Sequence, residues 1–304
     1  MVRIHHGPLS ISSNSHLVHH DLIARGRRVQ TARRWRSLVQ KFEACCGVKD
    51  SYDRADIVKF VAELRQEGMK QNSINSRLKA LRLLCQIQNW DGGFPRLAMP
   101  RVKDSEVSRP VFTAEQVANI ISRAKEVCSE RELAFLAAAS VYGLRREEVG
   151  TLEVCNGHIK VHTAKDGEVA FQIIPDAIKD YMKGYRACKD VRYMTRVFQR
   201  VMSKVGMEVN RGYGWHSIRR ALATELVLRD ISALNIVRFM RWSDTGVKGE
   251  FGMLAIYAKR NQSEIDRCIF EVHPFLGCWS EGGSHDRMLE LEVNISNPIL
   301  NAMR

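Results

Sequence analysis

The sequence lacks several features that mark large classes of proteins. No stretch approaches the run of about 18 apolar residues that a membrane-spanning helix needs, and the first 30 residues lack the apolar core of a secretory signal. The eight cysteines include no Cys-x-x-Cys pair and follow no regular spacing, which disfavours a zinc site or a disulfide framework. We therefore expect a soluble, cytoplasmic protein with reduced thiols, no metal and no cofactor.

Clustered Asp and Glu residues of the kind that bind Mg²⁺ are also missing, which disfavours an ordinary metallonuclease. The chain instead has an excess of positive charge: 47 Lys and Arg against 34 Asp and Glu give +13 over 304 residues. The excess is N-terminal, since residues 1–110 hold 20 basic and 10 acidic residues and the remainder holds 27 and 24. This balance predicts a polyanionic partner, nucleic acid before a membrane surface.

The 45% hydrophobic content is enough for two modest domains. Helical periodicity runs from about residue 25 to 90, a polar, Pro-bounded stretch over 100–111 indicates a linker, and residues 1–22 show little apolar pattern. We expect a flexible arm over 1–22, a helical domain over 23–99, the linker over 100–111, a second domain over 112–270 and a tail over 271–304.

The first domain has three apolar stripes at helical spacing, over 35–42, 57–64 and 74–85. Asp53 is a candidate N-cap for the second helix and Gly68 a candidate stop. Basic side chains crowd the polar faces, and two such helices favour contacts with a phosphate backbone over a merely solvated surface. The candidate DNA-binding residues are Arg33, Arg34, Arg36, Arg77, Lys79 and Arg82.

The second domain mixes helices with one β element. Alternation on both sides of Asp166-Gly167 predicts a hairpin over 158–174. A capping box at Thr113 opens a helix, and an Ala- and Leu-rich run over 132–141 predicts a buried helix that ends at Gly143. Further helices are expected over 176–187, 191–205, 217–229 and 233–241. The sequence thus predicts a mainly α fold with a small antiparallel sheet.

Arg145 lies where the buried helix ends and another begins, with Glu148 three residues on. A guanidinium near a helix N-terminus opposes the helix dipole, and an anionic ligand relieves that conflict. The alternative is that Arg145 and Arg146 only pair with Glu147 and Glu148 on the surface. Lys165 lies in the hairpin turn. Its long side chain can reach a neighbouring cleft as a functional cation, or it can simply face water, as most turn lysines do.

His216 and Arg219 stand three residues apart at the start of a helix that follows loop-forming glycines. This spacing puts both on one face, beside the free N–H groups of the helix, and such a site suits a phosphate. A structural histidine is the alternative for His216. Among seven tyrosines only Tyr257 lies beyond this segment, and neighbouring cations would make its phenol a nucleophile.

In their order along the chain, Gly143-Leu144-Arg145, Lys165, His216-Ser217-Ile218-Arg219, Trp242 and Tyr257 resemble the active-site set of the tyrosine recombinases, or integrases. The resemblance covers about residues 25–270 and implies that 23–99 is a helical core DNA-binding domain and 112–270 a catalytic domain. It implies a two-domain clamp around duplex DNA, in which Tyr257 forms a 3′-phosphotyrosyl bond without metal or ATP while Arg145 and Arg219 hold the non-bridging oxygens.

The resemblance assigns further roles. Lys165 matches the general acid for the 5′-oxygen, His216 the acid/base for the tyrosine proton, and Glu148 the acid that supports the first arginine. Trp242 falls where many members have a second histidine and some a tryptophan, so its indole N–H can donate to a phosphate oxygen; it can equally be a core aromatic beside Phe239.

The chain departs from the family pattern between Met240 and Tyr257. Met240-Arg241-Trp242 replaces the usual Leu-Gly-His, and the gap from Trp242 to Tyr257 is unusually long, which leaves both cis and trans delivery of the tyrosine open. After Tyr257 the family exchanges a C-terminal element between protomers, and residues 288–300 are amphipathic enough for that role; packing on their own domain is the simpler alternative.

The leading hypothesis is a site-specific recombinase that acts on double-stranded DNA as a homo-oligomer, a dimer on one site and a tetramer in the synapse. A type IB topoisomerase-like nicking-closing enzyme shares the chemistry without strand exchange. A non-catalytic DNA-binding synapsis protein is a third possibility, supported by the spacing of Tyr257.

Overall fold

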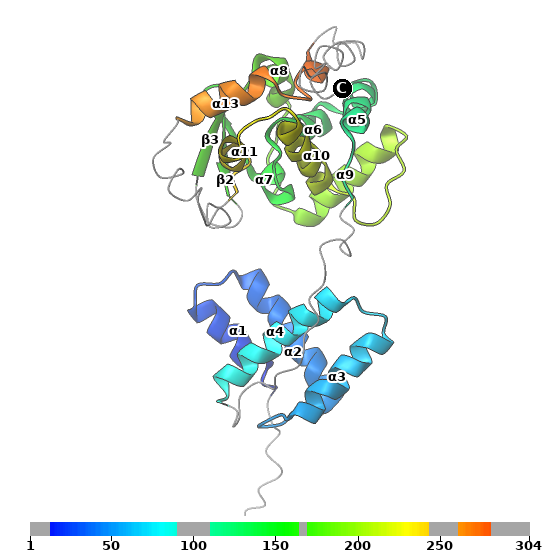
Figure 1. Cartoon of the computed structure of the whole chain (residues 1–304), viewed down its shortest axis with the longest axis vertical. Coiled ribbons are helices and arrows are strands. Elements are labelled where there is room, and N and C mark those ends of the chain that lie inside the picture. The colour runs from blue at the N-terminus through cyan, green and yellow to red at the C-terminus, as the bar shows by residue number, and fades with distance from the viewer. Residues whose placement is uncertain (1–12, 90–109, 164–168, 243–260, 281–304) are drawn as a thin grey trace, which may run out of the picture. The chain divides into compact units, whose positions relative to one another are not determined.

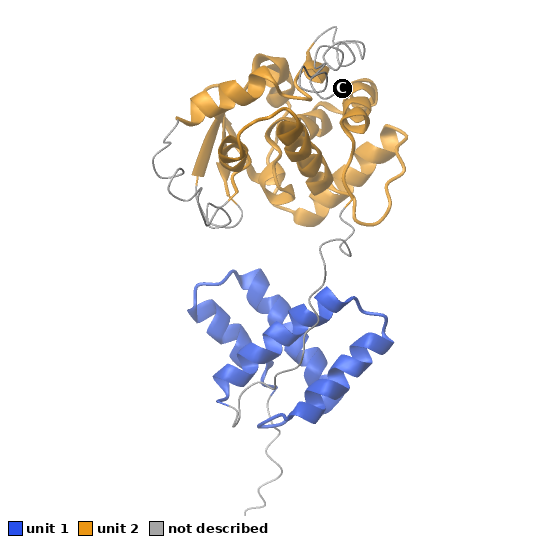
Figure 2. Cartoon of the chain, viewed as in Figure 1, with its two compact units in different colours: residues 1–108 blue, residues 109–304 orange. Residues whose placement is uncertain are grey.

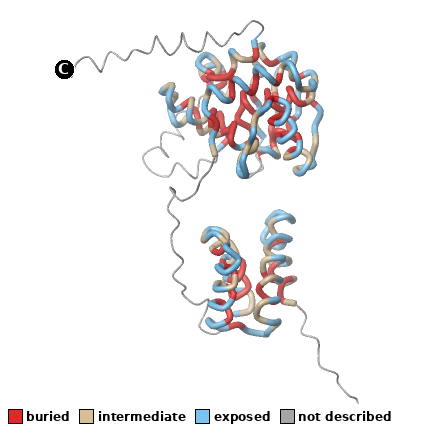
Figure 3. Tube along the Cα trace, turned by 90° about the vertical axis from the view of Figure 1, so that its right-hand side faces the viewer, coloured by how far each residue is buried: buried red, intermediate tan, exposed pale blue. Residues whose placement is uncertain are grey.

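The computed structural model describes residues 13–89, 110–163, 169–242 and 261–280. The chain divides into two compact units, Met1–Ser108 and Arg109–Arg304 (Figure 2). Their boundary falls within the stretch 100–111 that the sequence indicates as a linker, most of which lies outside the described residues. Each unit has its own hydrophobic core, shown in red in Figure 3.

The described part of the first unit, residues 13–89, contains four helices (Figure 1), α1 (Ser15–Ala24), α2 (Val29–Cys46), α3 (Arg54–Gln66) and α4 (Gln71–Ile87). The last three carry the predicted apolar stripes, and side chains such as Phe42, Phe60 and Leu81 are fully buried where the helices meet. Asp53 is the N-cap of α3, because its carboxylate accepts a hydrogen bond from the Asp56 backbone N–H at 2.9 Å.

Helix α1 corrects the expectation of a flexible arm over 1–22. Val18 and Leu22, four residues apart, are buried against α2 and α4. The Glu43 carboxylate also accepts hydrogen bonds from the Asn14 backbone N–H and the Ser13 hydroxyl, each at 2.6 Å. The histidines and serines around these two apolar residues hide the helical pattern in the sequence. Residues 1–12 lie outside the described part of the chain.

The second unit is mainly helical with a small sheet, as predicted. Its elements are α5 (Ala114–Val127), α6 (Glu130–Tyr142), α7 (Arg146–Thr151), β1 (Glu153–Cys155), β2 (His158–His162), β3 (Val169–Ile173), α8 (Asp176–Lys183), α9 (Val191–Lys204), α10 (Trp215–Leu228), α11 (Ala233–Phe239), α13 (Gln262–Glu271) and the 3₁₀ turn η3 (Gly277–Trp279). The antiparallel sheet has the order β1-β2-β3, with Lys160 opposite Phe171 in the predicted hairpin. Strand β1 was not predicted.

Helix α6 is the centre of this unit, and α5, α7, α8 and α10 all contact it (Figure 1). It ends at Gly143, which has the left-handed φ of +56°. A side chain there would be strained, and its Cβ would lie 2.7 Å from the Met240 Cε atom. Gly143 therefore lets the end of α11 approach the end of α6, and this close approach brings together the Gly143 and Met240 carbonyl oxygens that Arg219 binds.

The segment after α13 packs on its own unit, which corrects the expectation of a tail beginning at 271. His273, Phe275 and Trp279 are buried in the core around α6. The His273 Nε2 atom lies 2.9 Å from the Val141 carbonyl oxygen, and the Trp279 indole N–H donates to the Ser140 hydroxyl at 3.1 Å. The predicted exchange segment 288–300 lies outside the described residues. Within the described ranges, every helix is too short or too polar to cross a membrane.

Candidate active site

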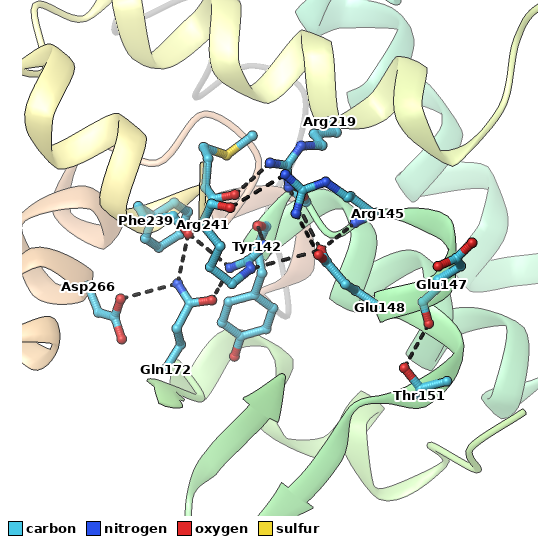
Figure 4. Close-up of polar contacts among 12 residues, drawn as sticks. Tyr142, Arg145, Glu147, Glu148, Thr151, Gln172, Arg219, Phe239, Arg241 and Asp266 are labelled. Atoms are coloured by element: carbon cyan, nitrogen blue, oxygen red, sulfur yellow. Dashed lines mark hydrogen bonds and ion pairs between the residues drawn. The ribbon is translucent and has the colours of Figure 1, made fainter. Parts of the chain in front are cut away.

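Arg145 links the end of α6 to the start of α7 and is paired with Glu148 (Figure 4). The Glu148 carboxylate accepts one hydrogen bond from the Arg145 backbone N–H at 2.8 Å and another from Arg145 Nη1 at 2.7 Å. The Glu148 side chain is fully buried, whereas that of Arg145 is 19% exposed. The pair is therefore no solvated surface ion pair, and Arg146 instead donates to the Thr195 hydroxyl at 3.0 Å.

Arg219 reaches the same place from the second turn of α10, and its side chain is only 2% exposed. Its Nη1 donates to the Gly143 carbonyl oxygen and its Nη2 to the Met240 carbonyl oxygen at 2.5 Å. Arg219 Nη1 also lies 4.0 Å from Glu148 Oε2. The helix that holds Arg219 is fixed by Trp215, whose buried indole N–H donates to the Met194 carbonyl oxygen at 2.8 Å.

A third arginine, Arg241, completes the cluster, and its side chain is 3% exposed. Its Nη2 donates to the Tyr142 carbonyl oxygen at 2.8 Å, its Nη1 donates to the Phe239 carbonyl oxygen at 2.9 Å, and Nη1 also contacts the Gln172 amide oxygen. Arg241 Nε lies 3.9 Å from Glu148 Oε2. Figure 4 shows the three guanidinium groups converging on Glu148.

The charges of the cluster are strongly coupled. Burial would raise the pKa of Glu148, but the charge of Arg241 and the hydrogen bonds from Arg145 hold that pKa below its ordinary value, so the carboxylate is ionised. Burial, together with the charges of Arg241 and Arg145, lowers the pKa of Arg219 to about 9. Burial also lowers the pKa of Arg241 to about 10. These directions describe a site with more positive charge than its carboxylates balance.

Two further predicted residues, His216 and Trp242, are described by the structure. His216 lies at the exposed start of α10, one turn before the buried Arg219. Trp242 is 40% exposed, and the Arg219 Cζ atom lies 5.7 Å from its ring centroid, within the range of a cation–π contact. Trp242 is therefore largely exposed and is not a core aromatic, whereas Phe239 is fully buried.

Two of the predicted catalytic residues, Lys165 and Tyr257, lie outside the described residues. The strands β2 and β3 that precede and follow Lys165 are described and paired as predicted. The structure therefore brings together Arg145, Glu148, Arg219 and Trp242. Within the described ranges, no group of three or more His, Cys, Asp or Glu side chains is arranged to hold a metal ion.

The predicted DNA-binding residues lie on α2 and α4 of the first unit. The exposed ones are Arg33, Arg34, Arg36, Lys79 and Arg82. Arg77 is half-buried and donates to the Ser73 carbonyl oxygen at 3.0 Å. The structure thus presents five of these six side chains to solvent.

Sequence reasoning missed the roles of Arg241, Gln172 and Asp266 in the cluster. The Gln172 amide N–H donates to Asp266 Oδ1 at 3.3 Å, and Asp266 Oδ2 accepts from the Ile173 backbone N–H at 2.9 Å. These contacts tie α13 and β3 to Arg241. The available signal was the arginine between Met240 and Trp242, which was noted only as a departure from a glycine.

No family model matches the chain, and no curated protein matches its sequence. Solved structures do match. A lambda integrase (75–356) dimer bound to a COC′ core site has a TM-score of 0.61 and 16% identity, with 78% of this chain and 97% of that chain covered. A lambda integrase tetramer bound to a Holliday junction has a TM-score of 0.60 and 18% identity, with 78% and 79% covered. XerH recombinase in a post-cleavage complex with a palindromic difH substrate has a TM-score of 0.56 and 12% identity, with 84% and 85% covered.

These similarities define the class to which the architecture belongs. A helical unit is followed by a mainly helical unit whose three-stranded sheet and central helix surround paired arginines. This is the fold of the tyrosine recombinases, and the chain shares it over most of its length. At identities this low, the similarity is one of fold.

Proposed function

We propose that this chain is a site-specific DNA recombinase or integrase, which cleaves and rejoins duplex DNA through a 3′-phosphotyrosyl intermediate without metal or ATP. The observation that carries the proposal is the arginine cluster, in which Arg145, Arg219 and Arg241 surround one buried carboxylate, Glu148. An anion in this place offsets the cost of burying so many cations. Arg145 is the most exposed of the three and is the one that a phosphate reaches first.

In this mechanism, Arg145 and Arg219 hold the non-bridging oxygens of the scissile phosphate and stabilise the charge that develops in the transition state. The Tyr257 oxygen attacks phosphorus, and the bond from phosphorus to the 5′-oxygen breaks. His216 accepts the tyrosine proton, Lys165 protonates the leaving oxygen, and the Trp242 indole N–H donates to a phosphate oxygen. A phosphodiester is exchanged for another phosphodiester, so rejoining needs no ATP.

Duplex DNA is the proposed partner. Lambda integrase is seen as a dimer on a core site and as a tetramer on a Holliday junction, and XerH is seen on its difH substrate. We extend this by fold to a dimer of the present chain on one site and a tetramer in the synapse. The basic faces of α2 and α4 supply affinity for the backbone through counterion release.

A pool of random duplexes, each nicked so that a cleaved end diffuses away, tests the proposal without knowledge of the target sequence. Wild-type protein in EDTA is expected to form a covalent adduct that survives denaturing electrophoresis, and Tyr257→Phe is expected to form none. Tyr193→Phe, a change of the same kind on α9, is the control and should keep the adduct. Adduct formation by Tyr257→Phe would overturn the role of Tyr257.

The same captured sites separate the alternatives. Two sites placed on one plasmid yield exchanged strands if the protein is a recombinase, and only relaxed topoisomers if it is a type IB topoisomerase-like enzyme. Tight DNA binding with no adduct from wild type at any site would favour a non-catalytic synapsis protein.

A further inference from the structure

Arg241 is a buried charge that the proposed mechanism leaves without a role. It occupies the left-handed region, with φ of +53°, where glycine is the usual residue. We infer that Arg241 is a positioning residue that fixes the phosphate-binding guanidinium groups of Arg145 and Arg219 by holding the groups that these two arginines contact. The inference rests on the proposed phosphate-binding role of the site.

The first contact is with the end of α6. The last carbonyl groups of a helix have no partner within the helix, and cations are favoured there. Arg241 donates a hydrogen bond to the Tyr142 carbonyl oxygen at 2.8 Å, and Arg219 donates one to the next carbonyl oxygen, that of Gly143. Two guanidinium groups therefore grip consecutive carbonyls, and Arg145 follows two residues later. A displaced Tyr142 carbonyl would displace both Arg145 and Arg219.

The second contact is with Glu148. Arg241 Nε lies 3.9 Å from Glu148 Oε2, and among the described residues this Nε has no hydrogen-bond partner. The attraction keeps Glu148 ionised and in place, and Glu148 in turn binds both the backbone N–H and the side chain of Arg145. Arg241 thus acts on Arg145 through the carboxylate that supports it.

The third contact joins the site to the sheet and to α13. Arg241 Nη1 contacts the Gln172 amide oxygen, Gln172 donates to Asp266, and Asp266 accepts the Ile173 backbone N–H. A planar guanidinium serves three directions at once, to α6, to Glu148 and to β3, which an ammonium group cannot do. A non-glycine residue keeps a strained, left-handed backbone only where several contacts from its surroundings hold it there.

Arg241 does not itself bind the phosphate. All three of its side-chain nitrogen atoms face protein groups: Nη1 contacts the Phe239 carbonyl oxygen and the Gln172 amide oxygen, Nη2 donates to the Tyr142 carbonyl oxygen, and Nε faces Glu148. Arg219, by contrast, lies against the exposed ring of Trp242. The removal of Arg241 should therefore weaken the hold on one phosphate and slow the chemical step, while affinity for the DNA backbone as a whole, which depends on many other cations, stays nearly constant.

Arg241→Lys is the variant of choice, because it keeps the positive charge but removes the planar guanidinium group that makes the three contacts. Arg229→Lys is the matched control, since Arg229 forms an ion pair with Glu225 at 2.5 Å. It lies ten residues beyond Arg219, about 15 Å along the helix axis. Binding of inorganic phosphate is measured by isothermal titration, and the part that Arg145→Met abolishes defines the site. Single-turnover cleavage of a captured nicked duplex gives a rate constant and an amplitude.

We expect Arg241→Lys to bind phosphate about tenfold more weakly at this site and to cleave about 100-fold more slowly. The amplitude should be unchanged, because misplacement lowers the rate constant whereas unfolding lowers the active fraction. The effects of Arg241→Lys and Arg219→Lys on the rate should be strongly non-additive, since one acts through the other. Arg229→Lys should match wild type in both measurements.

Unchanged phosphate affinity in Arg241→Lys, or a lower amplitude at an unchanged rate constant, would overturn the inference and leave Arg241 a structural residue only. If Arg241→Lys does not fold, Arg241→Gly, which relieves the positive φ, takes its place in both measurements. If wild type forms no adduct but Arg241→Lys still weakens phosphate binding, the proposed recombinase function fails and the positioning role of Arg241 stands.

Discussion

Several charged or polar side chains are buried in the core of the second unit. Glu148 is surrounded by cations, and His273 is enclosed beneath the end of α6. Each such group is stable only in one protonation state, because its partners were arranged for that state. The pH dependence of folding is therefore a direct probe of these contacts.

His273 gives the clearest case. Burial lowers the pKa of His273 to about 3, although the Val141 carbonyl oxygen opposes the shift. In the unfolded chain this histidine binds a proton below about pH 6.5, whereas in the folded chain it stays neutral down to about pH 3. The free energy of unfolding therefore has its full value above about pH 6.5 and falls as the pH drops towards 3. At pH 5.5 this effect should lower the free energy of unfolding by about 1.4 kcal/mol. Urea denaturation of the second unit at pH 7.5 and 5.5 measures it.

His273→Gln removes the titration and can still donate to the Val141 carbonyl oxygen, so it should lose less stability than wild type between these two pH values. His158→Gln, at the start of β2, is the control and should keep the wild-type difference. An identical pH dependence in wild type and His273→Gln would show that His273 is not held neutral by the fold.

Helices and strands decide where these side chains meet, and one glycine is critical to that meeting. Gly143 has φ of +56° and lies against Met240 and Leu222, whereas Gly157, with φ of +74°, has nothing within 4 Å of an added Cβ. Gly143→Ala should therefore cost the left-handed strain of about 1–2 kcal/mol and a further 1–3 kcal/mol, roughly, for overpacking against Met240. Gly157→Ala should cost the strain alone.

The free energies of unfolding of the two variants, from urea titration monitored by circular dichroism, test this comparison. Adduct formation should also fall in Gly143→Ala, because the Gly143 carbonyl oxygen is a partner of Arg219. Equal losses of stability in Gly143→Ala and Gly157→Ala would show that the approach of Met240 to the end of α6 is not tight.

The sequence predicted elements whose apolar spacing is long and regular. Helices α2 to α6 and the β2–β3 hairpin carry such patterns or strong capping and turn residues, and all were expected. Helix α1 was missed because only two buried apolar side chains, Val18 and Leu22, mark it. Strand β1 has three residues, too few for an alternation to be recognised.

The site was predictable only in part. Arg145 and Arg219 are 74 positions apart, and no local pattern requires them to meet at Glu148; only the resemblance to a family placed them together. The role of Arg241 could not be predicted, because its side chain points inward only when its backbone adopts a left-handed conformation, which local propensity assigns to glycine. Contacts of this kind are tertiary, and a sequence pattern does not record them.

Across the whole chain, the proposed function assigns affinity for the DNA backbone to the first unit and the chemistry to the second. The first unit carries the excess charge and the exposed arginines of α2, and the second carries the buried arginines. Replacing Arg33, Arg34 and Arg36 by Ala should lower the slope of log K against log salt by up to about 0.9 for each lost phosphate contact, and equally for target and non-target DNA. Fluorescence anisotropy over a range of salt concentrations measures the slope.

These three side chains are exposed, so the melting temperature of the first unit should not change. Arg186→Ala, which removes one exposed arginine in the loop after α8, is a control of the same kind and should keep the wild-type slope. A slope unaffected by the triple substitution would place the DNA contact on another surface.

The packing of the segment after α13 also governs how the protein can be shortened or labelled. Phe275 and Trp279 belong to the core around α6, and His273 holds a carbonyl oxygen only two residues before Gly143. A truncation at residue 270 would open a cavity directly beneath the arginine cluster, and the loss of activity would resemble the loss of a catalytic residue. Fluorophores, tags and fusion partners are therefore best attached after residue 280, with the whole of this segment retained.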